Sequence, residues 1–538
     1  MTAMTVTGDN LWELLVAREA ATPDGLLAID ERGRELTFRA LRGAAERVAA
    51  GLVDLGVAPG TVVSWQLPTW IEAMVLMGAL SRIGAVQNPL MPNYREREVG
   101  FIVGQTGSRL LLVPSQWRGF DHAGMARSIQ RATPGLEVLV LDAHVRDLPE
   151  GDPATLPPAP AAPSDPSEHP IRWLYYTSGT TADPKGAKHT DATIMATVPS
   201  MLQMLDPTPQ DRASVVFPLA HIGGAVWLAT SLTTGTTQLL AESFDPERTI
   251  PMLAEQGVTL AGTGTPFNLA YLAAQRSLRD GGSEARLFPT VRLFMSGASP
   301  KPPQLHYDLK RELGGTGIRS SYGLTECPML SATPRTSTDA QLAATEGTAS
   351  PGVTLRIVRG DGTEAGPGEE GEIRARAGQL FGGYVDPSLD AAALDERGYL
   401  RTGDLGRIDA DGFLTITGRL KDVIIRKGEN ISAKEIEDLL YEHPKVADVA
   451  VIGLPDDRSG ERACAVVALA PGADPLGFAE MQEHLRERGL RTLAFPEQLE
   501  IIGEVPRNAS GKIRKDELKR RYGAGRAADP SISGIGPP

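Results

Sequence analysis

Residues 176–186 read Tyr-Thr-Ser-Gly-Thr-Thr-Ala-Asp-Pro-Lys-Gly, so hydroxyls and small side chains lead into a Pro-Lys-Gly turn. The apolar run at residues 171–175 predicts a buried strand, and the segment is therefore expected to form a loop at a strand end. Small residues let several backbone N–H groups converge on an anion, and Lys185 adds a compact positive charge. This stretch predicts a loop that binds a nucleotide triphosphate.

The loop differs from the Walker A pattern, because Lys185 is followed by Gly rather than by Ser or Thr. The alternative is an ordinary surface turn, since clusters of Ser, Thr and Gly are common between regular elements. The order of hydroxyls followed by Pro-Lys-Gly, directly after an apolar strand, favours the phosphate loop.

Length and composition limit the possible classes of protein. A chain of 538 residues with 41% apolar and 22% charged residues predicts a globular protein with at least two domains. The sequence has no apolar run long enough for a membrane span, and its net charge of −13 argues against a nucleic-acid partner. The N-terminus lacks a signal-peptide pattern, and Cys327 and Cys464 lack metal-ligand spacing. We therefore expect a cytoplasmic protein.

The pattern of elements changes along the chain. Strand and helix signals alternate to about residue 300, which favours a parallel sheet, and residues 151–170 hold seven prolines and predict an exposed connector. After residue 347, turn clusters separate short apolar runs and predict a small β subdomain that ends near Arg419. The expected domains are residues 1–420 and 421–523, the second a compact α+β unit, with residues 524–538 a disordered tail.

Two segments near the middle of the chain have the residue types of an adenine and metal site. Residues 321–326 read Ser-Tyr-Gly-Leu-Thr-Glu and predict a short turn in which Tyr322 could stack on a base and Glu326 could ligate Mg²⁺. Residues 296–300 are small enough for a flat base to approach the backbone. Alone, the first segment is equally an ordinary turn with a capping Glu.

Three more polar positions follow. Asp404 is flanked by glycines in a predicted turn, where it could accept ribose hydroxyls or stabilise its own turn. Arg419 could bind ribose or phosphate, or form a surface salt bridge. Lys512 lies at the tip of a Ser-Gly turn near the C-terminus, where most lysines are simply solvated.

In this order and at this spacing, the five segments resemble the motifs of the adenylate-forming superfamily, which contains acyl-CoA synthetases, peptide-synthetase adenylation domains and luciferases. The resemblance runs from about Leu11 to Tyr522. It implies a large N-terminal domain of α/β sheets with a small β subdomain, followed by a small mobile α+β C-terminal domain. It also implies that a carboxylate is joined to AMP and then transferred to a thiol.

The resemblance also implies a role for each matching residue. ATP or AMP contacts would come from Thr177, Ser178, Gly179, Thr180, Thr181, Lys185, Gly297, Ala298, Ser299, Tyr322, Gly323, Thr325, Asp404 and Arg419. Glu326 would ligate Mg²⁺, Lys512 would be the catalytic lysine of the first half-reaction, and Lys421 would be the hinge.

Other segments resemble those of acyl- or aryl-CoA ligases. His221 would lie beside the acyl pocket and the carboxylate, although a structural histidine is an equal alternative. Further pocket candidates, each as readily explained by packing, are Gly224, Thr265, Phe267, Pro328 and Met329. Lys427 and Gly428 would line the CoA tunnel. Lys427 and Ala182 depart from the superfamily, which usually has Gly at both positions.

The resemblance therefore implies an acid–CoA ligase that uses ATP with Mg²⁺, an apolar carboxylic acid of medium size (fatty, alicyclic or aryl), and CoA. Two alternatives stay open: an enzyme that loads a carrier protein in trans, and a nucleotide-binding module without catalysis. The second would require the loss of Lys512, Glu326 or Asp404, and all three are present. The sequence leaves a homodimer open and does not identify the acid.

Overall fold

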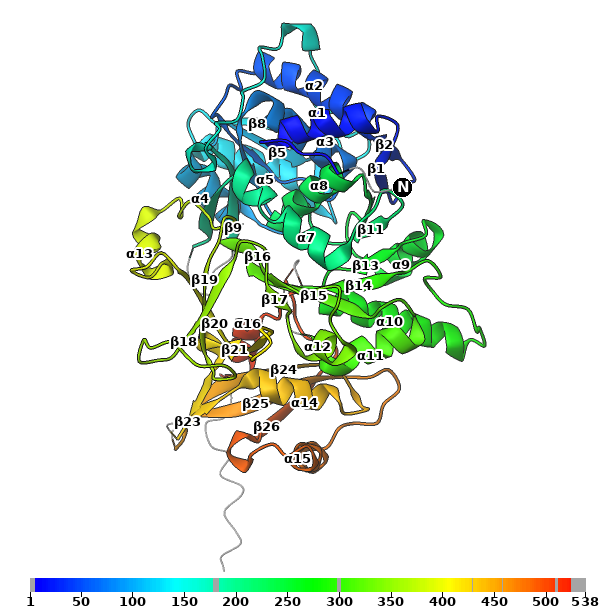
Figure 1. Cartoon of the computed structure of the whole chain (residues 1–538), viewed down its shortest axis with the longest axis vertical. Coiled ribbons are helices and arrows are strands. Elements are labelled where there is room, and N and C mark those ends of the chain that lie inside the picture. Colours follow the sequence, from blue (N-terminus) through cyan, green and yellow to red (C-terminus); the bar gives the residue numbers. More distant parts are fainter. Residues whose placement is uncertain are drawn as a thin grey trace, which may run out of the picture. The chain divides into compact units, whose positions relative to one another are not determined.

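The computed structural model describes residues 5–177, 183–297, 301–427, 429–456, 458–508 and 511–523 (Figure 1). The chain is a mixed α/β protein that divides into two compact units. The larger comprises residues 1–369, 373–402 and 408–415, and the smaller comprises residues 370–372, 403–407 and 416–538. In the described ranges, no helix is long and apolar enough to cross a membrane. The predicted fold class is confirmed, whereas the boundary predicted after residue 420 stays a prediction.

A nine-stranded sheet, counted over the described residues, forms the centre of the larger unit. Its order is β17-β16-β15-β14-β13-β11-β12-β1-β2, with neighbouring strands parallel from β15 to β1 and antiparallel at both ends. The strands are β1 (Leu26–Asp30), β2 (Glu35–Thr37), β11 (Arg212–Val215), β12 (Thr237–Leu240), β13 (Leu260–Gly262), β14 (Leu293–Ser296), β15 (Ile318–Leu324), β16 (Cys327–Ala332) and β17 (Thr348–Ala349).

A six-stranded sheet in the same unit carries the predicted phosphate loop. Its order is β10-β9-β4-β3-β5-β8. The strands are β3 (Val62–Trp65), β4 (Val86–Pro89), β5 (Leu110–Pro114), β8 (Glu137–Leu141), β9 (Ile171–Thr177) and β10 (Lys185–Thr190), and β6 (Gln116–Trp117) pairs separately with β7 (Phe120–Asp121). Strands β9 and β10 form an antiparallel hairpin, and the remaining neighbours in the six-stranded sheet are parallel.

Helices cover these sheets. They are α1 (Leu11–Ala21), α2 (Phe38–Asp54), α3 (Ile71–Ile83), α4 (Glu96–Thr106), α5 (His122–Ala132), α6 (Asp191–Met195), α7 (Val198–Leu205), α8 (Ile222–Thr234), α9 (Pro246–Glu255), α10 (Thr265–Asp280), α11 (Pro303–Glu312), α12 (Asp339–Ala344) and α13 (Asp390–Ala393). One apolar core joins both sheets through α1, α2, α3 and α8. A second packs α10 and α11 against β13, β14 and β15, beside which they lie in Figure 1.

The smaller unit has its own apolar core. Its sheet has the order β23-β22-β25-β24, with β26 paired to β25. The elements are β22 (Ile424–Arg426), β23 (Glu429–Ile431), α14 (Ala433–Tyr441), β24 (Val446–Asp456), β25 (Gly460–Leu469), α15 (Phe478–Glu487), β26 (Gln498–Ile502) and α16 (Lys515–Gly523). A separate sheet, whose residues are not confined to the smaller unit, has the order β18-β19-β20-β21 and consists of β18 (Thr354–Val358), β19 (Gly371–Arg376), β20 (Leu400–Ile408) and β21 (Leu414–Arg419).

Three local predictions were wrong, each because glycine or a hydroxyl was taken to indicate a turn. Residues 321–324 belong to β15, so the turn is confined to Thr325 and Glu326. Asp404 lies within β20, where Gly403 has a φ of 69°. Lys185 is the first residue of β10 rather than part of the loop. In each case the sheet hydrogen bonds outweigh the local turn preference.

Candidate active site

The ends of the predicted phosphate loop are fixed by the β9–β10 hairpin. Thr177 and Lys185 are direct cross-strand partners, so the loop leaves and re-enters the sheet at one point. Gly186 has a structural reason to be glycine, because a Cβ there would lie 2.6 Å from the ring of Tyr176. The other predicted loop contacts (Ser178, Gly179, Thr180 and Thr181) and Ala182 lie outside the described residues.

Glu326 lies at the turn between β15 and β16. Leu324 pairs with Cys327 across this hairpin, and the carbonyl of Glu326 accepts a hydrogen bond from the backbone N–H of Phe381 at 2.8 Å. A Cβ at Gly323 would lie 2.5 Å from the nitrogen of Met329, so the hairpin requires a glycine there. The turn therefore holds the Glu326 carboxylate at a fixed place on the sheet edge.

Tyr384 connects this carboxylate to the phosphate loop. Its segment is attached to β10 by two backbone hydrogen bonds. The Lys188 N–H donates to the Gly383 carbonyl, and the Val385 N–H donates to the Gly186 carbonyl. The buried Tyr384 hydroxyl donates to Glu326 Oε1 at 2.6 Å, and Lys185 Nζ lies 5.7 Å from the centre of its ring. Burial and then the Glu326 charge raise the pKa of Tyr384, so its hydroxyl stays a donor. Tyr384 was not predicted from the sequence.

His189 was also missed, and it positions Thr325. Its Nε2 lies 2.8 Å from the Thr325 carbonyl oxygen, and its Nδ1 lies 3.0 Å from the Thr193 hydroxyl. Burial lowers the pKa of His189 to about 4, so the ring is neutral at pH 7. A neutral ring with the proton on Nε2 donates to the carbonyl and accepts from the hydroxyl. The predicted α-phosphate contact thus has a fixed backbone.

The predicted adenine segments are neighbours. Strands β14 and β15 are parallel, with Ser296 opposite Ser320, and Gly297 follows directly. A Cβ at Gly297 would lie 3.3 Å from the Ser321 carbonyl, which leaves little room for a side chain. Tyr322 is buried in β15. Ala298 and Ser299 fall outside the described residues.

The predicted acyl-pocket residues divide between two apolar clusters. Phe267 packs with Phe244 in the α10–α11 core, whereas Met329 belongs to a cluster with Val226, Trp227 and Met295. That Phe267 and Met329 line one acyl pocket stays a prediction. Met329 is nevertheless unusual, because its φ of 58° is rare for a non-glycine residue.

The remaining acyl-pocket candidates have structural functions of their own. His221 caps α8, its Nδ1 accepting from the Gly223 N–H at 3.1 Å. A Cβ at Gly224 would lie 2.1 Å from the Leu219 carbonyl oxygen, so the backbone excludes any side chain there. Thr265 begins α10 and lies 3.5 Å from the Ser296 hydroxyl, and Pro328 is buried in β16. Their contact with an acid stays a prediction.

In the smaller unit, Asp404 and Arg419 form an ion pair. Arg419 Nε donates to Asp404 Oδ1 at 2.5 Å, with the carboxylate buried in β20 and the guanidinium partly exposed at the end of β21. The salt bridge that was one alternative for Arg419 is therefore present, and its partner is the buried carboxylate of Asp404. This arrangement orients both side chains, and their role as ribose contacts stays a prediction.

Lys512 is exposed on a short turn held by its backbone. Its N–H donates to Asn508 Oδ1 at 2.9 Å, and its carbonyl accepts from the Asn508 N–H at 2.9 Å. Arg507 donates to the Gly511 carbonyl at 2.7 Å and is paired with Asp448 at 2.8 and 2.9 Å. Arg507 and Asp448 therefore attach the Lys512 turn to the end of α14 and to β24, because Tyr441 also donates to Asp448.

The predicted hinge and CoA residues lie near one another in the sequence. Lys421 is exposed in a one-turn 3₁₀ helix at Leu420–Asp422. Lys427 is also exposed, has a φ of 52°, and donates its N–H to the Ser459 carbonyl at 2.7 Å. Glycine adopts such a left-handed backbone without strain, whereas a lysine does not. Gly428 is not among the described residues.

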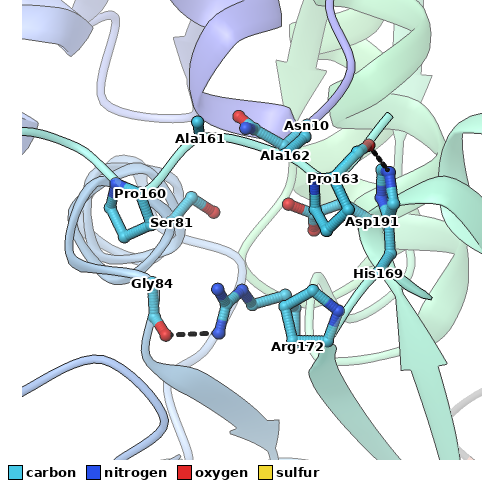
Figure 2. Close-up of a pocket in the computed structure, with 11 residues that line it drawn as sticks. Asn10, Ser81, Gly84, Pro160, Ala161, Ala162, Pro163, His169, Arg172 and Asp191 are labelled. Carbon is cyan, nitrogen blue, oxygen red and sulfur yellow. Dashed lines mark hydrogen bonds between the residues drawn. The ribbon is translucent and has the colours of Figure 1, made fainter. Parts of the chain in front are cut away.

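Two further features concern metal ligands and a small cavity. Over the part of the chain that the structure describes, no three His, Cys, Asp or Glu side chains could hold a metal ion. A cavity of about 20 Å³ lies between the connector and Arg172 (Figure 2). It has room for about one water molecule and none for a nucleotide.

Comparison with known families identifies the enzyme class. The model described as AMP-binding enzyme matches residues 16–385, and the one described as AMP-binding enzyme C-terminal domain matches residues 435–512. The chain belongs to the AMP-binding enzyme family. The resemblance to the adenylate-forming superfamily is therefore confirmed, and this AMP-binding enzyme falls in its CoA ligase branch.

Its relatives differ in their named activities. It is 30% identical over 511 residues (93% of this chain, 88% of the relative) to "Medium-chain fatty-acid--CoA ligase" of Escherichia coli. It is 33% identical over 526 residues, with the same coverages, to "Salicyl-AMP ligase / salicyl-S-ArCP synthetase" of Mycobacterium tuberculosis. ATP-bound MatB from Rhodopseudomonas palustris is 26% identical with a TM-score of 0.85, covering 96% of this chain and 99% of MatB.

Proposed function

We propose that this AMP-binding enzyme is an ATP-dependent carboxylic acid–CoA ligase. It would join an apolar acid of medium size to AMP, release pyrophosphate, and then form the acyl-CoA thioester. The main support for the proposal is that Tyr384 contacts two predicted site residues. Its hydroxyl donates a hydrogen bond to the Glu326 carboxylate, and its ring lies near the Lys185 ammonium group. A phosphate-loop cation and a carboxylate suited to Mg²⁺ are thereby held together in a chain of this family.

The first half-reaction needs charge compensation, because a carboxylate must attack the negatively charged α-phosphate of ATP. Lys185, at the start of β10, would bind the β- and γ-phosphates, and Thr325, whose carbonyl is bound by His189, would contact the α-phosphate. Glu326 would hold Mg²⁺ together with the phosphates, and the ion would neutralise charge that develops on the leaving pyrophosphate. Lys512 would contribute a positive charge between the acid and the α-phosphate.

The second half-reaction needs an open path for a thiol. The thiolate attacks the acyl carbonyl, the acyl–phosphate bond breaks, and AMP leaves with that electron pair. Lys427 and Gly428 would lie along the thiol arm, and Lys421 would be the pivot by which Lys512 leaves the site. Such a change of domain orientation would remove Lys512 after the first half-reaction and would make room for the thiol.

The thiol acceptor could also be a carrier protein. The Escherichia coli relative is named for CoA, whereas the name of the Mycobacterium tuberculosis relative includes a carrier-protein product. We favour CoA because the segment around Lys427 resembles that of CoA ligases. The carrier-loading enzyme is the second candidate. A cytoplasmic location and a homodimer stay predictions.

The deciding experiment measures pyrophosphate and AMP release by the full chain with a panel of linear, alicyclic and aromatic acids. We expect acid-dependent pyrophosphate release with ATP and Mg²⁺, and a sharp rise in turnover with CoA. Lys512→Ala should lose adenylation, whereas Lys519→Ala, a cation of the neighbouring helix, should not. Normal adenylation by Lys512→Ala would remove the role given to Lys512. Turnover with a phosphopantetheinylated carrier and none with CoA would establish the second candidate.

A further inference from the structure

A second cavity of about 360 Å³ lies in the larger unit, at the end of the nine-stranded sheet where β14 and β15 begin. Three arginines line it: Arg292 before β14, Arg319 in β15 and Arg335 after β16. Its apolar wall is formed by Met204 and Leu205 of α7 and by Leu293. Its volume is within the range of small-molecule sites.

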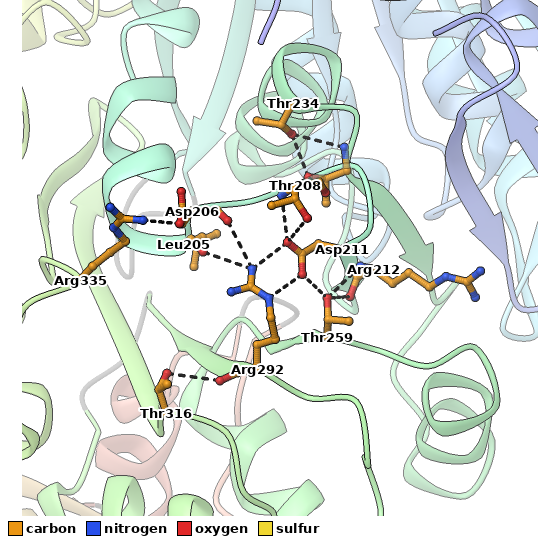
Figure 3. Close-up of polar contacts among 11 residues, drawn as sticks. Leu205, Asp206, Thr208, Asp211, Arg212, Thr234, Thr259, Arg292, Thr316 and Arg335 are labelled. Carbon is orange, nitrogen blue, oxygen red and sulfur yellow. Dashed lines mark hydrogen bonds and ion pairs between the residues drawn. The ribbon is translucent and has the colours of Figure 1, made fainter. Parts of the chain in front are cut away.

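Two of these arginines have carboxylate partners (Figure 3). Arg292 donates to both oxygens of Asp211, at 2.8 and 2.7 Å, and to the carbonyls of Leu205 and Asp206. Arg335 is paired with Asp206 at the surface. Asp206 is the one carboxylate among the described residues that line the cavity. The lining side chains therefore carry more positive than negative charge.

Arg319 has no such partner in the described part of the chain. Its side chain donates to the carbonyl oxygens of Pro334 at 3.2 Å and Arg335 at 3.4 Å, and its residue is 9% exposed. Its buried Nε has no hydrogen-bond acceptor among the described residues. Burial and then the charges of Arg335 and Arg292 lower the pKa of Arg319, against the attraction of Asp206. A buried cation without a bound anion is costly.

The cavity is separate from the nucleotide site. Arg319 precedes Tyr322 by three residues, roughly 10 Å along an extended strand. Leu293 and Met295 alternate with Phe294 on β14, and Met295 is the cross-strand partner of Arg319. Packed side chains of the cluster that contains Met295 and Met329 lie on this face. The arginine cavity is thus at the amino end of these strands, whereas the predicted adenine contacts are at the carboxyl end.

We propose that this cavity binds a small oxyanion, a carboxylate or a phosphate monoester, that carries a short apolar chain. The anionic head would lie between Arg319 and Arg335, where it would place a negative charge beside the buried guanidinium. The chain would pack against Met204, Leu205 and Leu293. Arginine suits this role because its planar fork binds carboxylate and phosphate through two hydrogen bonds. This ligand would be an effector rather than the acid that is activated.

Calorimetric titration of the full chain with hexyl phosphate, and separately with hexanoate, tests the proposal. Excess α,β-methylene-ATP and Mg²⁺ are present, so that phosphate probes do not occupy the nucleotide site and hexanoate cannot be adenylated. We expect saturable binding of at least one probe, weakened at least tenfold in Arg335→Gln. The probe whose binding Arg335→Gln weakens identifies the head group as phosphate or carboxylate. Arg356→Gln, which removes an arginine paired with Glu364 elsewhere in the same unit, should bind as the wild type does.

Arg335→Gln is the main variant because its side chain is half exposed and its loss should leave folding intact. Arg319→Gln, with folding verified by its melting temperature, should weaken binding further. Binding of neither probe to the wild type would overturn the proposal. Equal binding by wild type and Arg335→Gln would also overturn it, and would place the probe at another site.

Discussion

The hydroxyl of Tyr384 should determine how well the enzyme uses Mg²⁺. Tyr384→Phe removes the 2.6 Å hydrogen bond to Glu326 and keeps the ring that lies near Lys185 and packs on Phe381. A hydrogen bond to a charged group is worth about 1.5–3 kcal/mol. Because Glu326 is only partly buried, we take the lower end. A loss of about 1.4 kcal/mol corresponds to a tenfold change in an equilibrium constant.

We therefore expect the Mg²⁺ concentration for half-maximal pyrophosphate release to rise roughly tenfold in Tyr384→Phe, since the carboxylate is no longer held in one orientation. The raised pKa of Tyr384 keeps its hydroxyl protonated, so the effect should not change between pH 6 and 9. Tyr399→Phe is the matched control, because the Tyr399 hydroxyl makes no hydrogen bond in the described residues and its ring contacts Arg356 and Arg376. An unchanged Mg²⁺ requirement in Tyr384→Phe would refute the reasoning.

Three further changes test other parts of the structure. Asp448→Asn should lower the free energy of unfolding of the smaller unit by about 2 kcal/mol in urea, because Arg507 keeps its charge and loses its partner. Lys427→Gly should raise the free energy of unfolding of the smaller unit by about 0.5–1 kcal/mol, since the left-handed backbone strains a lysine. His189 has its pKa lowered to about 4 by burial, so the unfolded chain binds the proton more readily. Stability should therefore fall as pH drops from about 6.5 to 4, by up to 1.4 kcal/mol per unit, and less in His189→Gln.

Each of these three substitutions has a matched control variant. Asp474→Asn removes an exposed acid of the smaller unit and should leave urea unfolding unchanged. Lys427→Ala keeps the strained backbone and should give none of the gain expected of glycine. His144→Gln, at an exposed position, should preserve the acid-dependent loss of stability. A pH profile that is identical in wild type and His189→Gln would exclude the buried imidazole as its source.

The sequence was sufficient where hydrophobic periodicity is strong. The strand predicted at residues 171–175, before the phosphate loop, lies within β9. The pairing of Thr177 with Lys185 could not be predicted, because it depends on the β9–β10 register. Asp404 was predicted to lie in a turn because glycines are nearby in the sequence. In the structure it lies within strand β20, which includes these glycines.

The missed residues share one property: their partners are distant in the sequence. Tyr384 and Glu326 are 58 positions apart, and His189 and Thr325 are 136 apart. Neither pair forms a local motif, and each is brought together by strand β10 and the hairpin turn. A buried histidine and a tyrosine in a glycine-rich segment are also common structural residues, so nothing in the single sequence marked them.

As a predicted wall of the acyl pocket, Gly224 restricts how the acid range could be altered, because its backbone contact leaves no room for a side chain. A mutant library that varies this position would mostly yield chains in which the start of α8 is displaced, because the obstacle is a main-chain oxygen. Gly223 is different: a Cβ there would meet the Phe217 ring at 3.0 Å and the His221 ring at 3.1 Å. Side chains can move where a carbonyl cannot, so paired changes at Phe217 and Gly223 are the better starting point for directed evolution of substrate range.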